Sequence, residues 1–117
     1  MSEVERINVE KRLSDMAVYN GIAYLAGQVP QDSTLDIQGQ TAEVLATIDR
    51  LLTTAGTDKS RILMAQIFLT NMKEFDGMNK AWDAWVAPGN APPRATVEAR
   101  LANPDFKVEI VVTAAVA

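Results

Sequence analysis

The sequence contains no cysteine and no histidine. Without cysteine there can be no disulfide, no thiolate nucleophile and no zinc–thiolate site. Without histidine, the commonest general base and the commonest transition-metal ligand are both missing, which excludes Ser–His and Cys–His hydrolase schemes. Any acid–base chemistry must therefore use carboxylates, lysine, tyrosine or ordered water, and we expect a site that involves no metal.

Clusters of positive charge and long hydrophobic runs are also missing. The 11 Lys and Arg residues are outnumbered by 15 Asp and Glu, for a net charge of −4. Nucleic-acid and membrane surfaces need clustered positive charge. The apolar stretches are far shorter than the ~20 residues of a membrane span, and the charged residues 1–6 do not resemble a signal peptide. We therefore expect a cytoplasmic protein that binds neither nucleic acid nor membranes.

The patterning of the 117 residues predicts one domain, residues 1–117, that begins with strands. Residues 16–19 and 22–26 are apolar runs joined by Asn20-Gly21, the pair typical of a two-residue hairpin turn. A weaker strand is expected at residues 5–9. Residues 62–69 read as a buried strand, and two final strands are expected at residues 94–101 and 107–116, joined by a turn at residues 103–105.

Two segments have helical periodicity instead. In residues 37–52 the apolar positions fall on one helical face, with Gly56 as the expected stop. Asn71 and Glu74 resemble a capping box that opens a second helix, whose stripe of Phe75, Met78, Trp82 and Trp85 is interpreted as core packing. This order of elements predicts an α+β domain with both helices on one face of the sheet. The bare second face then predicts an oligomer.

Strand alternation singles out Arg94 and Glu109. Glu109 interrupts an otherwise apolar strand, where an unpaired charge is costly unless it lies at a cleft. If the last two strands form an antiparallel hairpin, Glu109 lies level with residues 96–98, and Arg94 is close to it on the same sheet. The pair could then bind a carboxylate and position a water molecule. The simpler alternative is a plain salt bridge between the two side chains, and spacing alone does not decide between them.

Several short blocks of the chain match one known family in order and spacing. They are Gly27-Gln28-Val29-Pro30, Gln40-Thr41, residues 67–75, Met78-Asn79, residues 93–97 and Val108-Glu109-Ile110. Together they resemble the Rid/YjgF family of reactive intermediate deaminases over nearly the whole chain. Residues 12–15 and 79–86 are most similar to its short bacterial YoaB-like branch.

The resemblance implies a chorismate-mutase-like fold and a homotrimer whose sheets pack into a central barrel, with ligand clefts between subunits. It also implies hydrolysis of 2-imino or 2-enamino acids, released by pyridoxal-phosphate enzymes, to 2-oxo acids and ammonia without a cofactor. Arg94 then clamps the substrate carboxylate, Glu109 orients the attacking water, and Gly27 and Asn79 line the pocket. These groups could suffice, because an imine carbon is already electrophilic and water needs positioning more than activation.

The chain departs from the typical family pattern in the wall of the implied pocket. Leu13 replaces a tyrosine, Ala26 replaces a serine, and Thr96 replaces a cysteine, while Arg12 adds a positive group without an obvious counterpart. The lost hydroxyl groups favour an alternative, a non-catalytic trimer that binds or senses a small 2-oxo acid. Translation inhibition or RNA cleavage has been attached to some relatives. Nothing here supports it, because the chain has no basic stripe, no histidine pair and no predicted aromatic platform.

Overall fold

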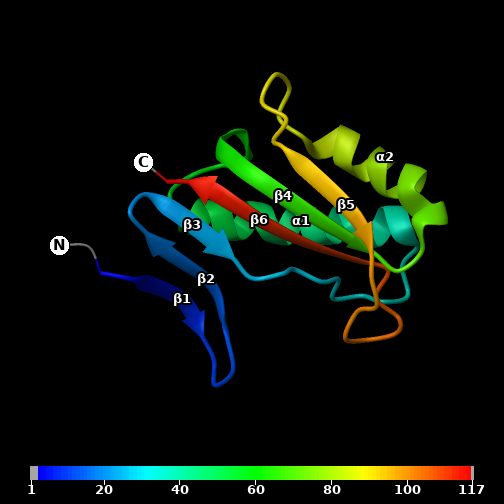
Figure 1. Cartoon of the computed structure of the whole chain (residues 1–117), viewed down its shortest axis with the longest axis horizontal. Coiled ribbons are helices and arrows are strands. Elements are labelled where there is room, and N and C mark those ends of the chain that lie inside the picture. Colours follow the sequence, from blue (N-terminus) through cyan, green and yellow to red (C-terminus); the bar gives the residue numbers. More distant parts are fainter. Residues whose placement is uncertain (1–2, 117) are drawn as a thin grey trace.

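Six strands form one mixed sheet, and two α-helices cover one of its faces (Figure 1). The computed structural model describes residues 3–116. The elements are β1 (Glu5–Val9), β2 (Ser14–Tyr19), β3 (Ile22–Leu25), α1 (Ile37–Thr54), β4 (Ile62–Leu69), α2 (Phe75–Trp85), β5 (Arg94–Glu98) and β6 (Val108–Ala115). The sheet order is β1-β2-β3-β6-β4-β5, with all neighbours antiparallel except β4 and β5. The predicted α+β class and the placement of both helices on one face are confirmed.

The turn between β2 and β3 has the predicted conformation. Asn20 and Gly21 have φ values of 50° and 77°, in the left-handed region that a type I′ turn requires at both central residues. Asn tolerates this region better than most residues with a side chain, and Gly adopts it without steric cost.

The first helix begins at a side-chain cap formed by Asp36. Asp36 accepts a hydrogen bond from the backbone N–H of Gly39 at 2.8 Å, and so satisfies one of the unpaired donors of the first turn. The helix runs to Thr54, two residues beyond the predicted range, and Gly56 follows with φ of 79°. Its buried side chains form the predicted apolar face.

The second helix starts later than predicted. Asn71 does act as a cap, but it accepts from the N–H of Lys73 at 3.0 Å within a 3-10 turn, Met72–Glu74. The α-helix then starts at Phe75, and Glu74 makes no side-chain capping hydrogen bond. The capping signal therefore marked the onset of helical structure but not of the regular helix.

The predicted hairpin between the last two strands is wrong. β4 lies between β5 and β6, pairing in parallel with β5 and antiparallel with β6. The reason is the helix: β4, α2 and β5 form a crossover unit, which brings the second strand back parallel to the first. β6 then occupies the other side of β4. In addition, β5 ends at Glu98 rather than at residue 101.

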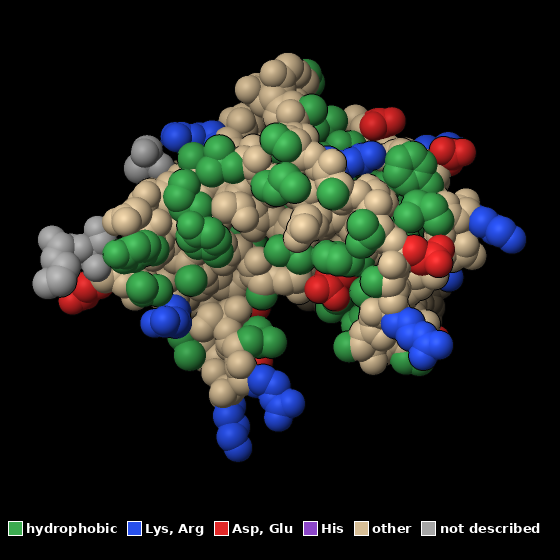
Figure 2. All heavy atoms as spheres, in the orientation of Figure 1, with side chains coloured by type: hydrophobic (Ala, Val, Ile, Leu, Met, Phe, Trp, Pro, Cys, Tyr) green, Lys and Arg blue, Asp and Glu red, His purple; other side chains and the backbone are tan. Residues whose placement is uncertain are grey.

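Within residues 3–116, helices cover only one face of the sheet. The protein measures 47 × 38 × 20 Å, and the shortest dimension accommodates one sheet and one layer of helices. Hydrophobic side chains are spread over the other face (Figure 2), which we call the open face. Exposed large side chains on it include Tyr24, Met64 and Val97. The trimer expected to cover this face stays a prediction. Within residues 3–116, neither helix combines the length and hydropathy needed to span a membrane.

Candidate functional site

Arg94 is the first residue of β5 and lies on the helix-covered side of the sheet. Its Nη1 donates a hydrogen bond to Oδ1 of Asn79 on α2, at 2.8 Å. The guanidinium carbon lies 5.1 Å from the ring centre of Trp82 and 5.8 Å from that of Phe75. Because the hydrogen-bond partner is a neutral amide, it leaves the positive charge of Arg94 available to an anion.

Thr96 lies two residues further along β5 and faces the same side. It pairs with Ile67 in the ladder, as Arg94 pairs with Ala65, and both partners are fully buried among the core residues. The Oγ1 of Thr96 is buried and has no hydrogen-bond partner in the part of the chain that the structure describes. A buried hydroxyl without a partner costs stability, so its presence calls for a reason. We refer to Arg94, Asn79 and Thr96 together as the arginine group.

Glu109 points to the open face. Its neighbours in β6, Val108 and Ile110, are fully buried on the helix side, so alternation directs the Glu109 side chain away from the helices. Gly27 lies against it: a Cβ atom at position 27 would be 2.8 Å from Cδ of Glu109 and closer still to its Oε2. A side chain at position 27 would therefore displace the Glu109 carboxylate from this position. We refer to Glu109 and Gly27 together as the glutamate group.

The arginine group and the glutamate group lie on opposite faces of the sheet. Phe68 of β4 pairs with both Glu109 and Val97, so Glu109 is level with residues 96–98 of β5, as predicted. It is two strands away, however, and Arg94 points to the other side. The expected proximity of Arg94 and Glu109 within one chain is wrong, and so is the alternative of a salt bridge between them in one chain.

The remaining predicted residues, Leu13 and Ala26, line an open hollow beside the tip of the β1–β2 hairpin. The hollow has a volume of about 510 Å³, and Arg12 also lines it. The side chain of Leu13 is 52% exposed, so it does not fill the hollow as a core residue would. Ala26 directly precedes Gly27, which places this hollow at the same end of the sheet as the glutamate group.

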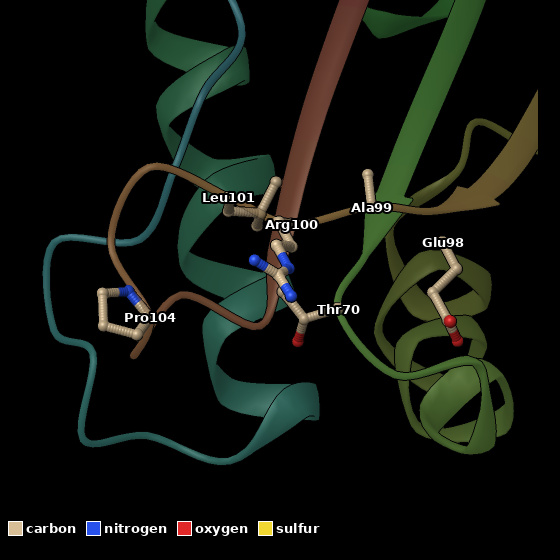
Figure 3. A pocket seen from close by; sticks show the side chains of 6 residues that line it. All are labelled: Thr70, Glu98, Ala99, Arg100, Leu101 and Pro104. Atoms are coloured by element: carbon tan, nitrogen blue, oxygen red, sulfur yellow. The ribbon is translucent and has the colours of Figure 1, made fainter.

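A second pocket, of about 560 Å³, contains none of the predicted residues. It lies at the far end of β5 from Arg94 and is lined by Thr70, Glu98, Ala99, Arg100, Leu101 and Pro104 (Figure 3). The carboxylate of Glu98 accepts a hydrogen bond from the backbone N–H of Met72 at 2.9 Å and points away from Arg100 in this view. The pocket therefore shows no arrangement that competes with the arginine and glutamate groups as a reaction centre.

Comparison with known proteins decides the family. The family model described as endoribonuclease L-PSP matches residues 3–116. The chain belongs to the YjgF/Rid family. A RutC family protein of Haemophilus ducreyi is 60% identical over 97% of each chain. The RutC family protein YoaB of Escherichia coli is 50% identical over 97% of this chain and 98% of its own.

Solved structures of YjgF/Rid relatives share the fold. A YjgF family member from Neisseria meningitidis, 43% identical, superposes with a TM-score of 0.95 over 98% of this chain and 96% of its own. A protein from Salmonella typhimurium, described as a putative translation initiation inhibitor, is 50% identical and gives a TM-score of 0.90 over 97% of each chain. The family prediction made from the sequence blocks is thus confirmed.

Sequence reasoning missed the two aromatic neighbours of Arg94. Phe75 and Trp82 were interpreted only as core residues, and Trp82 is indeed 5% exposed. The available signal was Asn79, a polar residue one turn from each of them on the same helical face. A polar side chain between two aromatic residues on a buried helix face needs a hydrogen-bond partner, which indicates that another polar side chain packs against that face.

Proposed function

We propose that this YjgF/Rid protein hydrolyses small 2-imino acids and their enamine tautomers to 2-oxo acids and ammonia. The observation that carries the proposal is the state of Arg94, whose guanidinium is held by an amide and two aromatic rings and keeps its positive charge for a ligand. The family relationship adds the substrate class, and a cytoplasmic location would bring the protein to the enzymes that release such imines.

Each group has a separate task in this reaction. Arg94 holds the substrate carboxylate through charge-assisted hydrogen bonds, which fixes the neighbouring imine carbon in place. Glu109 accepts a hydrogen bond from a water molecule and directs its oxygen to that carbon. A C–O bond forms while one water proton passes through Glu109 to the nitrogen, which gives a carbinolamine. The hydroxyl proton then passes through Glu109 to the same nitrogen, the C=O bond forms, and the C–N bond breaks to release ammonia and leave the 2-oxo acid.

The cleft would be formed between copies of the chain. The arginine and glutamate groups face opposite sides of one sheet, so a single copy does not bring them to one substrate molecule. β5 is an edge strand and β6 is central, with Glu109 on the open face. In a trimer that covers the open face, Arg94 at the edge of one copy can meet Glu109 of the next.

An enzyme-coupled assay tests this function. A pyridoxal-phosphate dehydratase supplies 2-aminoacrylate, and pyruvate release is measured with and without the protein. We expect acceleration by the wild type and a fall in kcat/KM of roughly 10²-fold for Arg94→Ala and Glu109→Gln, because each removes a charge-assisted contact to the reacting groups. Arg100→Ala is the matched control, since it removes an exposed arginine from the other pocket. No acceleration by wild type, or full acceleration by Arg94→Ala, would disprove the proposal.

The second candidate is a non-catalytic protein that binds a 2-oxo acid. It is favoured by the exposed apolar Leu13 in the hollow, which offers no hydroxyl to the reaction. Calorimetric binding of 2-oxobutanoate to a wild-type protein that does not accelerate pyruvate release would select this function. RNA cleavage, which the family description names, gains no support from a chain of net charge −4 without histidine.

A further inference from the structure

We infer that Trp82 and Phe75 are positioning residues for Arg94, which hold its guanidinium ready for a carboxylate. The inference deepens the proposed function and rests on it for the identity of the ligand. It concerns side chains that do not themselves touch the substrate. The alternative is that Trp82 is only a core residue and that Arg94 lies beside it by chance.

The geometry around Arg94 is that of a cradle on one face of α2. Phe75, Asn79 and Trp82 are spaced at i, i+4 and i+7, so they line up along the same side of the helix. Asn79 accepts the hydrogen bond from Nη1, and the two rings lie one turn away on either side of it. The guanidinium is therefore contacted both by the hydrogen-bond acceptor and by two π systems. We call Phe75, Asn79 and Trp82 the cradle.

The cradle has a clear physical effect on Arg94. An arginine side chain has many rotamers. If a ligand must fix one of them on binding, the lost conformational entropy weakens its affinity. Aromatic rings attract the guanidinium without using its N–H donors, and Asn79 uses one of the five. The remaining donors stay available for a carboxylate. An ion pair with Asp or Glu would also hold the guanidinium, but it would neutralise the charge that the ligand needs.

The cradle is anchored to the rest of the helical layer. The ring of Trp82 lies 5.3 Å from that of Trp85, and Nε1 of Trp85 donates to Oδ2 of Asp49 on α1 at 2.9 Å. Trp85 also packs against Lys59. Trp82 is itself 5% exposed, so its own packing in the core, rather than the Trp85–Asp49 hydrogen bond, holds its ring beside Arg94. Trp85 offers a control, because it stabilises the same helix and forms neither a cation–π pair nor a hydrogen bond with Arg94.

Side-chain NMR of Arg94 tests the cradle without any ligand. In wild type we expect restricted rotation of the guanidinium, seen as separate signals for its Nη groups. Trp82→Leu should merge these signals, Trp82→Phe should keep them largely separate, and Trp85→Phe should leave them unchanged although it removes the hydrogen bond to Asp49. Free rotation in wild type, or signals that remain separate in Trp82→Leu, would overturn the inference.

The same variants are then compared for binding of 2-oxobutanoate by calorimetry. Trp82→Leu should raise Kd about tenfold, which corresponds to ~1.4 kcal/mol, and Trp82→Phe should recover most of the affinity. Trp85→Phe should lower Tm but keep Kd. If Kd followed Tm across all three variants, the role of Trp82 would be structural only. If wild type showed the restricted signals but bound no 2-oxo acid, the proposed function would be wrong, whereas the positioning of Arg94 by the cradle would be supported.

Discussion

Thr96 carries a buried hydroxyl that no described group satisfies, on the same face of β5 as Arg94. The cost of such a group in a core is on the order of 1–3 kcal/mol. Proteins tolerate it where a ligand or an ordered water supplies the missing partner. We therefore expect the Thr96 hydroxyl to lower the stability of the protein and, in return, to bind a ligand beside Arg94.

Replacing Thr96 by valine separates the two effects. Valine keeps the shape of the side chain and removes the unpaired hydroxyl, so we expect unchanged or raised stability in urea unfolding. If the hydroxyl hydrogen-bonds the substrate, kcat/KM in the pyruvate assay should fall by about five- to tenfold, as for a loss of roughly 1 kcal/mol. Thr113→Val, on β6, is the control that should not change kcat/KM. A Thr96→Val protein with lower stability and full activity would contradict this assignment.

At the scale of elements, Gln40 of α1 joins two loops to the helix. It is fully buried, and its Nε2 lies 3.1 to 3.2 Å from the backbone carbonyls of Ser33, Leu35 and Asp105, among which its two N–H donors are shared. Its Oε1 accepts from the backbone N–H of Lys107 at 2.8 Å. Lys107 directly precedes β6, so this amide also fixes where the strand that carries Glu109 begins.

Gln40→Leu should therefore be strongly destabilising. It leaves several buried backbone groups without a partner, and we expect the free energy of unfolding to fall by about 3 kcal/mol in urea denaturation. Gln38→Leu is the matched control, because Gln38 lies on the exposed side of the same helix and should change stability by less than about 0.5 kcal/mol. Equal losses for the two variants would show that the buried network contributes little.

Local patterns predicted most elements and their faces. The Asn20-Gly21 turn, the apolar face of α1 and the alternation along β6 all depend on residues close in sequence, and the structure has each of them. Boundaries were less predictable. The predicted start of α2 is too early because Asn71 caps a 3-10 turn, and the same capping residue can precede a 3-10 turn or an α-helix.

At the scale of the whole molecule, the separation of Arg94 from Glu109 makes the proposed cleft dependent on assembly. The two side chains lie on opposite faces, with β4 between their strands. If each cleft of a trimer takes Arg94 from one copy and Glu109 from the next, mixing an inactive Arg94 variant with an inactive Glu109 variant should restore part of the activity. A site within one chain would not show this recovery.

Co-expression of Arg94→Ala and Glu109→Gln copies with different tags provides this test. In a mixed ring of three, one interface combines the intact Arg94 of one variant with the intact Glu109 of the other. Random assembly should therefore recover about one quarter of wild-type pyruvate release. Each variant expressed alone should stay inactive. A mixture as inactive as its parents, with mixed trimers demonstrated by the tags, would place both residues in one chain.

The sequence by itself determined which residues are candidates for the chemistry and which way Glu109 points. The absence of histidine and cysteine restricted the chemistry, the family blocks identified Arg94 and Glu109, and alternation directed Glu109 away from the core. Only the tertiary structure decided that β4 separates their strands, that Arg94 lies in an aromatic cradle and that the two groups face opposite sides. Strand order and helix–sheet contacts join residues far apart in sequence, and no local period encodes them.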